Sequence, residues 1–220
     1  MFKHRQEAGR LLAQRLKKYR NTHCIVYALP RGGVIIGHEI AKSLSAPLDL
    51  VITRKIAHPL DPEYAIGAVS ESGELQCDEY EQKAVGMQWI KEEAMRQMAE
   101  AKRRRQTYLG RKSFSPKGKI AIIVDDGVAT GFSIGLAIRE IQKQKPAKIV
   151  VAVPVIPDDT AKKLAPLVDE LIALEIGKPF LGSIGQYYHE FPQIEDEEVI
   201  VLLRQSRGKP RAKTTRNRHA

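Results

Sequence analysis

Short runs that are almost wholly apolar alternate with amphipathic segments along most of this chain, and this alternation constrains the fold more than any other feature. Clear examples of the runs are "CIVYAL" (24–29), "KIAIIV" (119–124) and "KIVVAVPV" (148–155). A strand that is apolar on both sides must be covered on both sides, as happens in parallel sheets that are flanked by helices. We therefore predict an α/β fold with a parallel central sheet and helices on both faces.

The other elements are predicted from apolar periodicity and from turn residues. Further strands are expected at 48–53, 65–70, 74–78 and 170–176. The middle two form an exposed hairpin that turns at Ser72 and Gly73. Helices are expected over 4–18, 34–44, 79–108, 131–144, 158–166 and 196–204. The last segment contains Val-Ile-Val, but Asp196 suits a helix N-cap, so we assign a helix there.

Length and composition indicate one good-sized domain, or one domain with a small subdomain, outside a membrane. A chain of 220 residues buries enough surface to need no disulfide or metal. Cys24 and Cys77 form no C-x-x-C pair, so we expect ordinary thiols in a reducing compartment. No apolar run reaches the roughly 18 residues of a membrane span, and the charged N-terminus lacks a secretory signal. We expect a cytoplasmic protein with no membrane partner.

The net charge of +10 is concentrated at the C-terminus. Residues 204–220 contain seven Lys and Arg and no acid, whereas the rest of the chain has 29 basic against 26 acidic residues. A segment so basic and so poor in apolar residues is expected to be a disordered, solvated tail. It could also bind RNA or DNA non-specifically through phosphates, although we do not favour that interpretation.

The stretch "VDDGVATGFS" after the run 119–124 carries the strongest chemical signal. Ligands of parallel α/β sheets bind beyond the carboxyl ends of the strands. Small residues followed by a helix N-terminus make an anion site that suits phosphate. Asp125 and Asp126 would repel phosphate but can accept hydrogen bonds from vicinal hydroxyls, so a sugar phosphate satisfies both parts. The alternative is an acidic strand end like that of a response-regulator receiver.

Two more loops at predicted strand ends favour an anionic ligand over that alternative. "LPRGG" (29–33) joins two glycines to Arg31, which suits a tight loop that holds an anion with backbone amides and a guanidinium. Arg54 and Lys55 follow the strand predicted at 48–53. If they converge with Arg31 on one rim, they would neutralise a departing anion.

Together these segments resemble type I phosphoribosyltransferases. "AIIVDDGVATGFS" matches the signature of that family almost throughout, with Phe132 where a second glycine is common and Ser133 for a frequent Thr. "RQEAGRLLAQRL", "RKIAHPLDPEYAIGAVSESG" and "IGQYYHEFPQIEDEEV" extend the resemblance to a group of bacterial predicted phosphoribosyltransferases. Ala57 and His58 depart from the Gly-Ala pair common there, so the conformation of that loop is left open.

The resemblance implies an enzyme that uses Mg²⁺ and phosphoribosyl pyrophosphate. It would transfer ribose 5-phosphate to a nitrogen of an unidentified base-like acceptor and release pyrophosphate. The catalytic residues that carry over are Asp125 and Asp126 on the ribose diol and Arg31 and Lys55 on the pyrophosphate. Those expected to bind substrate are Pro30, Gly32, Gly33, Arg54, Gly127, Val128, Ala129, Thr130, Gly131, Phe132 and Ser133. The ligand should hold most of the Mg²⁺, so we expect no metal site made of protein groups alone.

The resemblance also implies how the chain is divided into a domain, an insertion and a hood. Residues 1–203 would form the phosphoribosyltransferase domain, with a hairpin and long-helix insertion at 61–113, where related enzymes carry a mobile loop. Residues 1–20 and 177–203 would form a small hood that selects the acceptor. The hood contains Tyr187, Tyr188, His189 and Phe191, which could stack on a base or pack the hood.

Several further expectations concern the insertion, assembly and a rival function. Glu71 is a candidate for closing over the site, and "KRRR" (102–105) is expected to be a solvated helix face. A homodimer is the expected assembly. The alternative function is a regulator that senses phosphoribosyl pyrophosphate and binds RNA or DNA through its basic residues. In related enzymes the pyrophosphate loop often contains a non-proline cis peptide.

Overall fold

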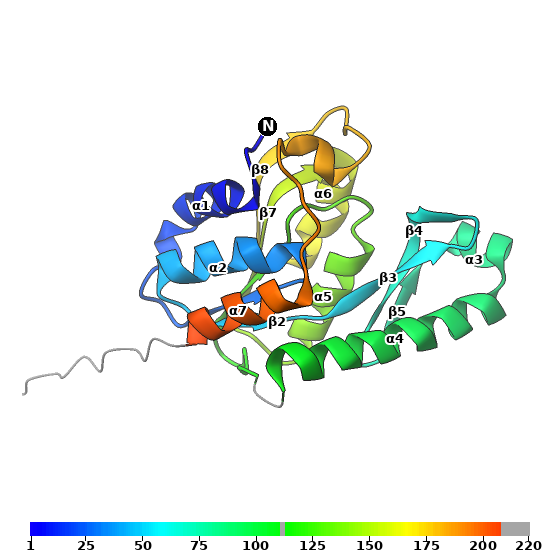
Figure 1. The fold of residues 1–220 in the computed structure, drawn as a ribbon, viewed down its shortest axis with the longest axis horizontal. Coiled ribbons are helices and arrows are strands. Elements are labelled where there is room, and N and C mark those ends of the chain that lie inside the picture. Colours follow the sequence, from blue (N-terminus) through cyan, green and yellow to red (C-terminus); the bar gives the residue numbers. More distant parts are fainter. Residues whose placement is uncertain (111–112, 208–220) are drawn as a thin grey trace, which may run out of the picture.

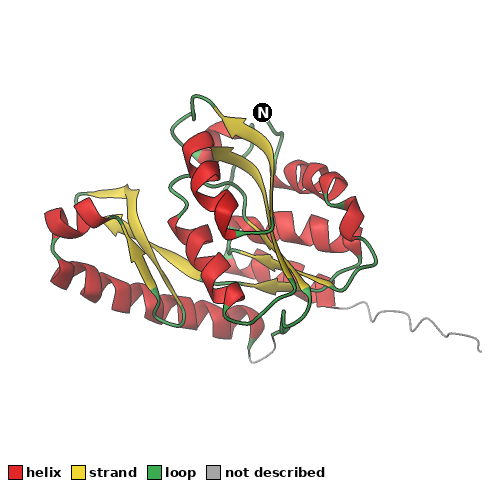
Figure 2. Cartoon of the chain, turned by 180° about the vertical axis from the view of Figure 1, so that it is seen from behind, coloured by secondary structure: helices red, strands yellow, loops and turns green. Residues whose placement is uncertain are grey.

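The structure, a computed structural model, describes residues 1–110 and 113–207. Its core is a five-stranded parallel sheet in the order β2-β1-β6-β7-β8 (Figure 2). In chain order these strands are β1 (Cys24–Ala28), β2 (Leu48–Leu50), β6 (Ile120–Val124), β7 (Lys148–Pro157) and β8 (Glu170–Gly177). The prediction of an α/β fold with a parallel central sheet is therefore confirmed.

Helices cover both faces of this sheet, as predicted (Figure 1). One face carries α1 (Arg5–Arg15), α2 (Gly32–Leu44) and α7 (Asp196–Arg207), and the other carries α5 (Phe132–Gln142) and α6 (Asp158–Leu164). Alternate strand residues point to opposite faces. Ile122 of β6 accordingly packs in the core under the first group of helices, and Ile123 packs in the core under the second. Two cores on one sheet explain why the runs are apolar at every position.

A second, antiparallel sheet of three strands extends from the core. It has the order β3-β4-β5, with β3 (Thr53–His58), β4 (Asp61–Ser70) and β5 (Leu75–Cys77). The expected hairpin is present as β4 and β5. The strand predicted at 48–53 is wrong in extent, because it ends at Leu50 and the chain enters β3 at Thr53.

The long helix expected over 79–108 is two helices, α3 (Glu79–Val85) and α4 (Met87–Leu109). Gly86 separates them with φ of 93°, a conformation that glycine adopts at little cost and that ends a helix. With the second sheet these helices form an arm that projects from the core (Figure 1). The arm has its own apolar cluster around Ile56, Ile66, Val69 and Ala94.

The remaining elements are short or lie near the chain ends. Three 3₁₀ helices occupy Lys17–Tyr19, Ala165–Leu167 and Ile184–Tyr187. Helix α7 continues to Arg207, so residues 204–207 are helical where we expected the tail to begin, and the predicted tail from 208 onward lies outside the described residues. Among the helices described, none is long and apolar enough to cross a membrane.

Candidate functional site

Asp125 and Asp126 lie at the carboxyl end of β6, the middle strand of the central sheet. A short loop connects them to α5, with Ala129 and Thr130 exposed at its tip. The loop is fixed below this tip, because the Val128 N–H donates to Val155 O at 2.9 Å. The first backbone bond of α5 runs from Gly135 N–H to Gly131 O, so the preceding N–H groups of the helix are available to an anion.

The glycine loop 30–33 packs directly against the acidic pair. A Cβ added to Gly32 would lie 1.8 Å from Asp126 Oδ2, and one added to Gly33 would lie 2.9 Å from Asp125 Oδ1. The peptide bond between Pro30 and Arg31 is cis. Two segments about 90 residues apart in the sequence therefore meet at the carboxyl edge of the sheet, and glycine is required at this contact because any side chain would collide with a carboxylate.

Asp126 has a partner that the sequence did not indicate. Nε of Arg5 donates to Asp126 Oδ2 at 2.7 Å, and Arg5 is only 6% exposed. The Tyr188 hydroxyl donates to the carbonyl oxygen of Asp126, also at 2.7 Å. Arg5 belongs to a helix that we predicted from apolar periodicity alone, and a charged residue at its start is not distinguished by such a pattern.

Asp125 is half-buried, and its carboxylate accepts a hydrogen bond from the Asp126 N–H at 2.8 Å. Burial raises the pKa of Asp125 well above its ordinary value, and the negative charge of Asp126 raises it further. Arg5 acts in the opposite direction. Neighbouring carboxylates in such surroundings are strong hydrogen-bond acceptors when charged, provided that a cation offsets their repulsion.

The three candidate cations are arranged differently from our expectation. Nη1 of Arg31 is 3.5 Å from Glu195 Oε2 and 3.6 Å from Asp196 Oδ1. Nε of Arg54 donates to Gln97 Oε1 at 3.0 Å on α4, and burial lowers the pKa of this guanidinium. Arg54 is thus half-buried and not fully exposed as we expected, the charge of Arg31 also lowers its pKa, and its role in binding substrate stays a prediction.

Lys55 is exposed and lies on the opposite face of the second sheet from Arg54, because successive strand residues alternate. Lys55 pairs across the sheet with Ala68, which pairs in turn with Gln76. Gln76 Oε1 is 3.2 Å from the position of a Cβ on Gly135 in α5. The face that carries Lys55 is thus the one turned toward the start of α5.

Helix α4 supplies side chains that contact other elements of the fold. The Tyr108 hydroxyl donates to Asp196 Oδ1 at 2.6 Å, and this bond lowers the pKa of Asp196. Nε of Arg105 donates to Glu71 Oε2 at 2.8 Å. The run 102–105 is therefore not simply a solvated face, and Glu71 pairs with Arg105 of α4, while its closing over the site stays a prediction.

The aromatic residues of the hood mostly pack against one another. Tyr187 and Tyr188 are 1% and 4% exposed. Tyr187 stacks on Phe180 with ring centroids 5.5 Å apart, and Tyr188 lies 4.9 Å from Phe191. Of the two alternatives for these tyrosines, packing of the hood is the one that the structure supports.

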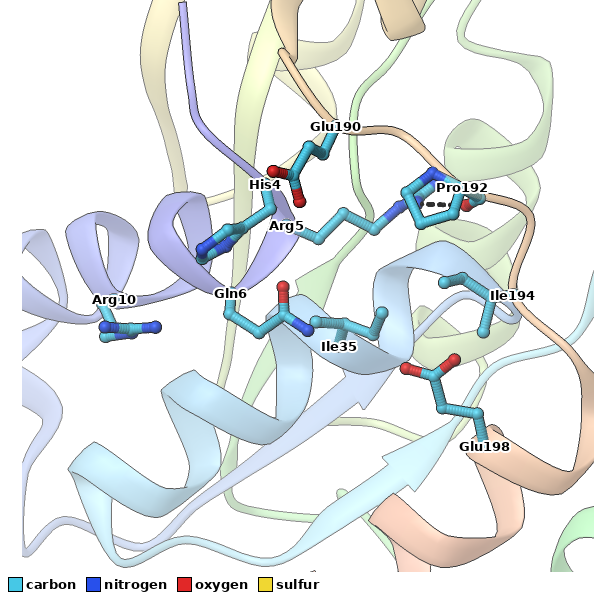
Figure 3. A pocket seen from close by; sticks show the side chains of 9 residues that line it. All are labelled: His4, Arg5, Gln6, Arg10, Ile35, Glu190, Pro192, Ile194 and Glu198. Carbon is cyan, nitrogen blue, oxygen red and sulfur yellow. Dashed lines mark hydrogen bonds between the residues drawn. The ribbon is translucent and has the colours of Figure 1, made fainter.

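A cavity of about 380 Å³ opens beside Arg5, between the start of α1 and the segment before α7 (Figure 3). In Figure 3 the Arg5 side chain crosses toward Pro192, to whose carbonyl oxygen Nη1 donates at 2.8 Å. The residues that line the cavity are His4, Arg5, Gln6, Arg10, Ile35, Glu190, Pro192, Ile194 and Glu198.

Comparison with known proteins gives a consistent result. The profile of the phosphoribosyl transferase domain matches residues 3–189. Two curated proteins from Mycobacterium tuberculosis strains CDC 1551 and H37Rv, both named "Putative phosphoribosyl transferase", are each 37% identical over 206 residues. These matches cover 92% of this chain but 46% of each relative, so the chain spans about half their length. The crystal structure of TT1426 from Thermus thermophilus aligns with a TM-score of 0.73 at 36% identity, over 93% of this chain and 98% of that one.

Proposed function

The chain belongs to the phosphoribosyl transferase domain family, and from this premise we propose that it transfers ribose 5-phosphate from phosphoribosyl pyrophosphate to a nitrogen of a base-like acceptor. The observation that carries the proposal is the contact of the glycine loop 30–33 with Asp125 and Asp126. It brings an anion-binding loop, a pair of carboxylates and a helix N-terminus to one edge of the sheet.

The two ends of the ribose 5-phosphate group would be bound by different groups. Asp125 and Asp126 accept hydrogen bonds from the ribose diol, while the amides and hydroxyls of 127–133 bind the 5-phosphate. The phosphate lies away from the reacting carbon, so its binding energy serves to position the sugar. Positive charge develops on the ring as the bond to pyrophosphate breaks, and the carboxylates stabilise that charge.

Pyrophosphate, the leaving group, would be bound by the loop 30–33 and by basic side chains. The bond between C1 of the ribose and the pyrophosphate oxygen breaks, and a bond from C1 to the acceptor nitrogen forms, while that nitrogen loses a proton. Amides of the 30–33 loop, Arg31 and Lys55 hold the negative charge that pyrophosphate gains. Arg31 is already turned to anions in the ligand-free protein, where it faces Glu195 and Asp196.

Magnesium would be carried mainly by the donor. The described residues contain no group of three or more His, Cys, Asp or Glu that could hold a metal ion. Mg²⁺ prefers to keep water and phosphate oxygens as ligands, which the diphosphate of the donor supplies. Its contribution is to offset the charge of the departing pyrophosphate.

Three expectations remain predictions. A regulatory role with RNA or DNA depends chiefly on basic residues after 207, which lie outside the described residues. A homodimer and a cytoplasmic location are likewise retained as predictions.

The proposal is tested by calorimetric titration of the protein with Mg²⁺ and phosphoribosyl pyrophosphate. The double variant Asp125→Asn, Asp126→Asn should bind the donor several kcal/mol more weakly, at about 1.5–3 kcal/mol for each hydrogen bond to a charged group. The matched control is Asp158→Asn, Asp159→Asn, a second adjacent pair whose carboxylates already face Lys162, Lys163 and Lys178.

The control variant should bind the donor like the natural protein, and thermal melts establish that each variant is folded. If the double variant at 125 and 126 is folded and binds the donor with unchanged affinity, the carboxylates do not hold the diol.

A further inference from the structure

Arg5 is the first residue of α1, and its guanidinium contacts three residues from two other segments of the site. Nε donates to Asp126 Oδ2 at 2.7 Å, and Nη1 donates to the carbonyl oxygen of Pro192 at 2.8 Å. The guanidinium carbon lies 3.6 Å above the centre of the Phe191 ring. A stacked arginine with two such hydrogen bonds holds its partners in one geometry.

We infer that Arg5 is a positioning residue that fixes Asp126 and supplies the positive charge needed for the acidic pair to bind the ribose diol. This inference rests on the proposed function, and it assigns Arg5 no contact with the reacting atoms. Two observations support it independently, namely the choice of carboxylate oxygens that remain for a ligand and the charges around the pair.

The contacts select one oxygen from each carboxylate. Oδ2 of Asp126 is taken by Arg5, and the same atom lies 1.8 Å from the Cβ position of Gly32, so it is covered by the glycine loop. Oδ1 of Asp125 accepts the Asp126 N–H. Within the described residues, the side chains of the two aspartates also interact with each other, and Oδ1 of Asp126 and Oδ2 of Asp125 are the oxygens that we assign to two neighbouring hydroxyls. Because Tyr188 holds the Asp126 carbonyl, both the backbone and the side chain of Asp126 are fixed.

The charges around the pair also depend on Arg5. Within the described part of the chain, Arg5 is the cation that forms an ion pair with Asp126. Tyr188 approaches from the hood, and burial raises the pKa of its hydroxyl, so it stays neutral. The loop 30–33 contributes Gly32 and Gly33 at this contact. Without Arg5, two adjacent carboxylates would face each other with no counter-charge in contact, and the pair would take up a proton more readily.

Two variants and a control separate this role from simple packing. Arg5→Gln removes the charge, Arg5→Lys keeps it, and Arg10→Gln removes a charge from an exposed arginine of the same helix. Carboxyl NMR titration of the ligand-free protein should show the Asp125–Asp126 pair taking up its proton at higher pH in Arg5→Gln. The titration should be near that of the natural protein in Arg5→Lys and unchanged in Arg10→Gln. An unchanged titration in Arg5→Gln overturns the inference.

Donor binding provides the second measurement. Calorimetry at a lower and a higher pH should find that Arg5→Gln binds Mg²⁺–phosphoribosyl pyrophosphate about tenfold or more weakly at the lower pH, with a smaller loss at the higher pH, where a larger fraction of the pair is charged. An equal loss at both pH values would show that Arg5 only supports the structure. If the natural protein itself fails to bind the donor, the proposed function falls, whereas the carboxyl titration still decides whether Arg5 sets the charge of the pair.

Discussion

At the scale of single residues, the charged acidic pair lowers the stability of the fold while it provides hydrogen-bond acceptors for a ligand. Asp125 is half-buried and lies beside a second carboxylate, and both effects raise its pKa. Because the pKa is higher in the folded than in the unfolded chain, the stability linked to this group is complete below its ordinary value of 3.8. It is lost as the pH rises through the folded value. The charged form of Asp125 therefore lowers the free energy of unfolding at pH values above that folded pKa.

The raised pKa of Asp125 leads to a prediction about the stability of Asp125→Asn. The variant keeps the oxygen that accepts the Asp126 N–H but cannot become charged. At about pH 8 its free energy of unfolding should exceed that of the natural protein, because the charged form that lowers the stability of the natural protein cannot form. Near pH 3.5 the two proteins should have the same stability. Urea denaturation at both pH values measures the difference.

The control for that measurement is a carboxylate whose pKa is shifted in the opposite direction. Lys162 lowers the pKa of Asp158 by a hydrogen bond, so Asp158→Asn should not gain stability at pH 8. If the difference in free energy of unfolding between Asp125→Asn and the natural protein were the same at pH 8 as at pH 3.5, the charge of Asp125 would not lower the stability of the fold.

Residues of the site differ in how far the sequence could reveal them. The loop after β6 and the glycines at 32 and 33 were found because small residues and paired acids form a contiguous pattern. Arg5 and Tyr108 were missed because their roles arise from contacts with Asp126 and Asp196, far away in the sequence. A long-range contact of one charged or hydroxyl side chain leaves no local periodicity.

At the scale of elements, the site depends on the close approach of the start of α2 to the end of β6. Gly32 is the first residue of α2, a position where helix propensity alone favours alanine. The structure instead predicts that alanine is unfavourable at this position, because a Cβ at Gly32 would lie 1.8 Å from a carboxylate oxygen that Arg5 already holds.

We therefore predict that Gly32→Ala lowers the free energy of unfolding by about 1–3 kcal/mol and also weakens binding of the donor. Chemical denaturation and calorimetry measure the two effects. Gly182→Ala is the control, since its φ of 91° makes alanine unfavourable but no atom lies within 4 Å of the added Cβ. The control should lose stability through backbone strain and keep its donor affinity. A Gly32→Ala protein with natural donor affinity would contradict the assigned contact.

Most elements were predictable, and the errors have identifiable causes. The strands of the central sheet were recognised because two cores require apolar residues on both faces. Strand β3 was missed because Arg54 and Lys55 were interpreted as rim cations and not as alternating residues of a strand. The break at Gly86 was missed because helix-favouring residues on both sides outweighed one glycine in the pattern.

At the scale of the whole molecule, the arm adds a second, smaller apolar cluster to the family fold. The arm of β3–β5, α3 and α4 has its own apolar cluster, but α4 also packs into the core of the central sheet through Ala101, Tyr108 and Leu109. Polar contacts add to this packing, such as those of Tyr108 with Asp196 and of Arg105 with the Leu50 carbonyl oxygen. Such contacts arise between distant segments, so the sequence indicated an insertion without indicating where it docks. The acceptor is likewise not specified by any local pattern.

The central claim is that one edge of the sheet binds the three parts of phosphoribosyl pyrophosphate at three defined groups. A crystal structure of the protein with Mg²⁺ and this donor tests it most directly. We predict the ribose diol within hydrogen-bonding distance of Asp125 and Asp126, the 5-phosphate over 127–133, and the pyrophosphate on the loop 30–33. A donor bound elsewhere, with both aspartates in contact only with protein groups, would contradict the account.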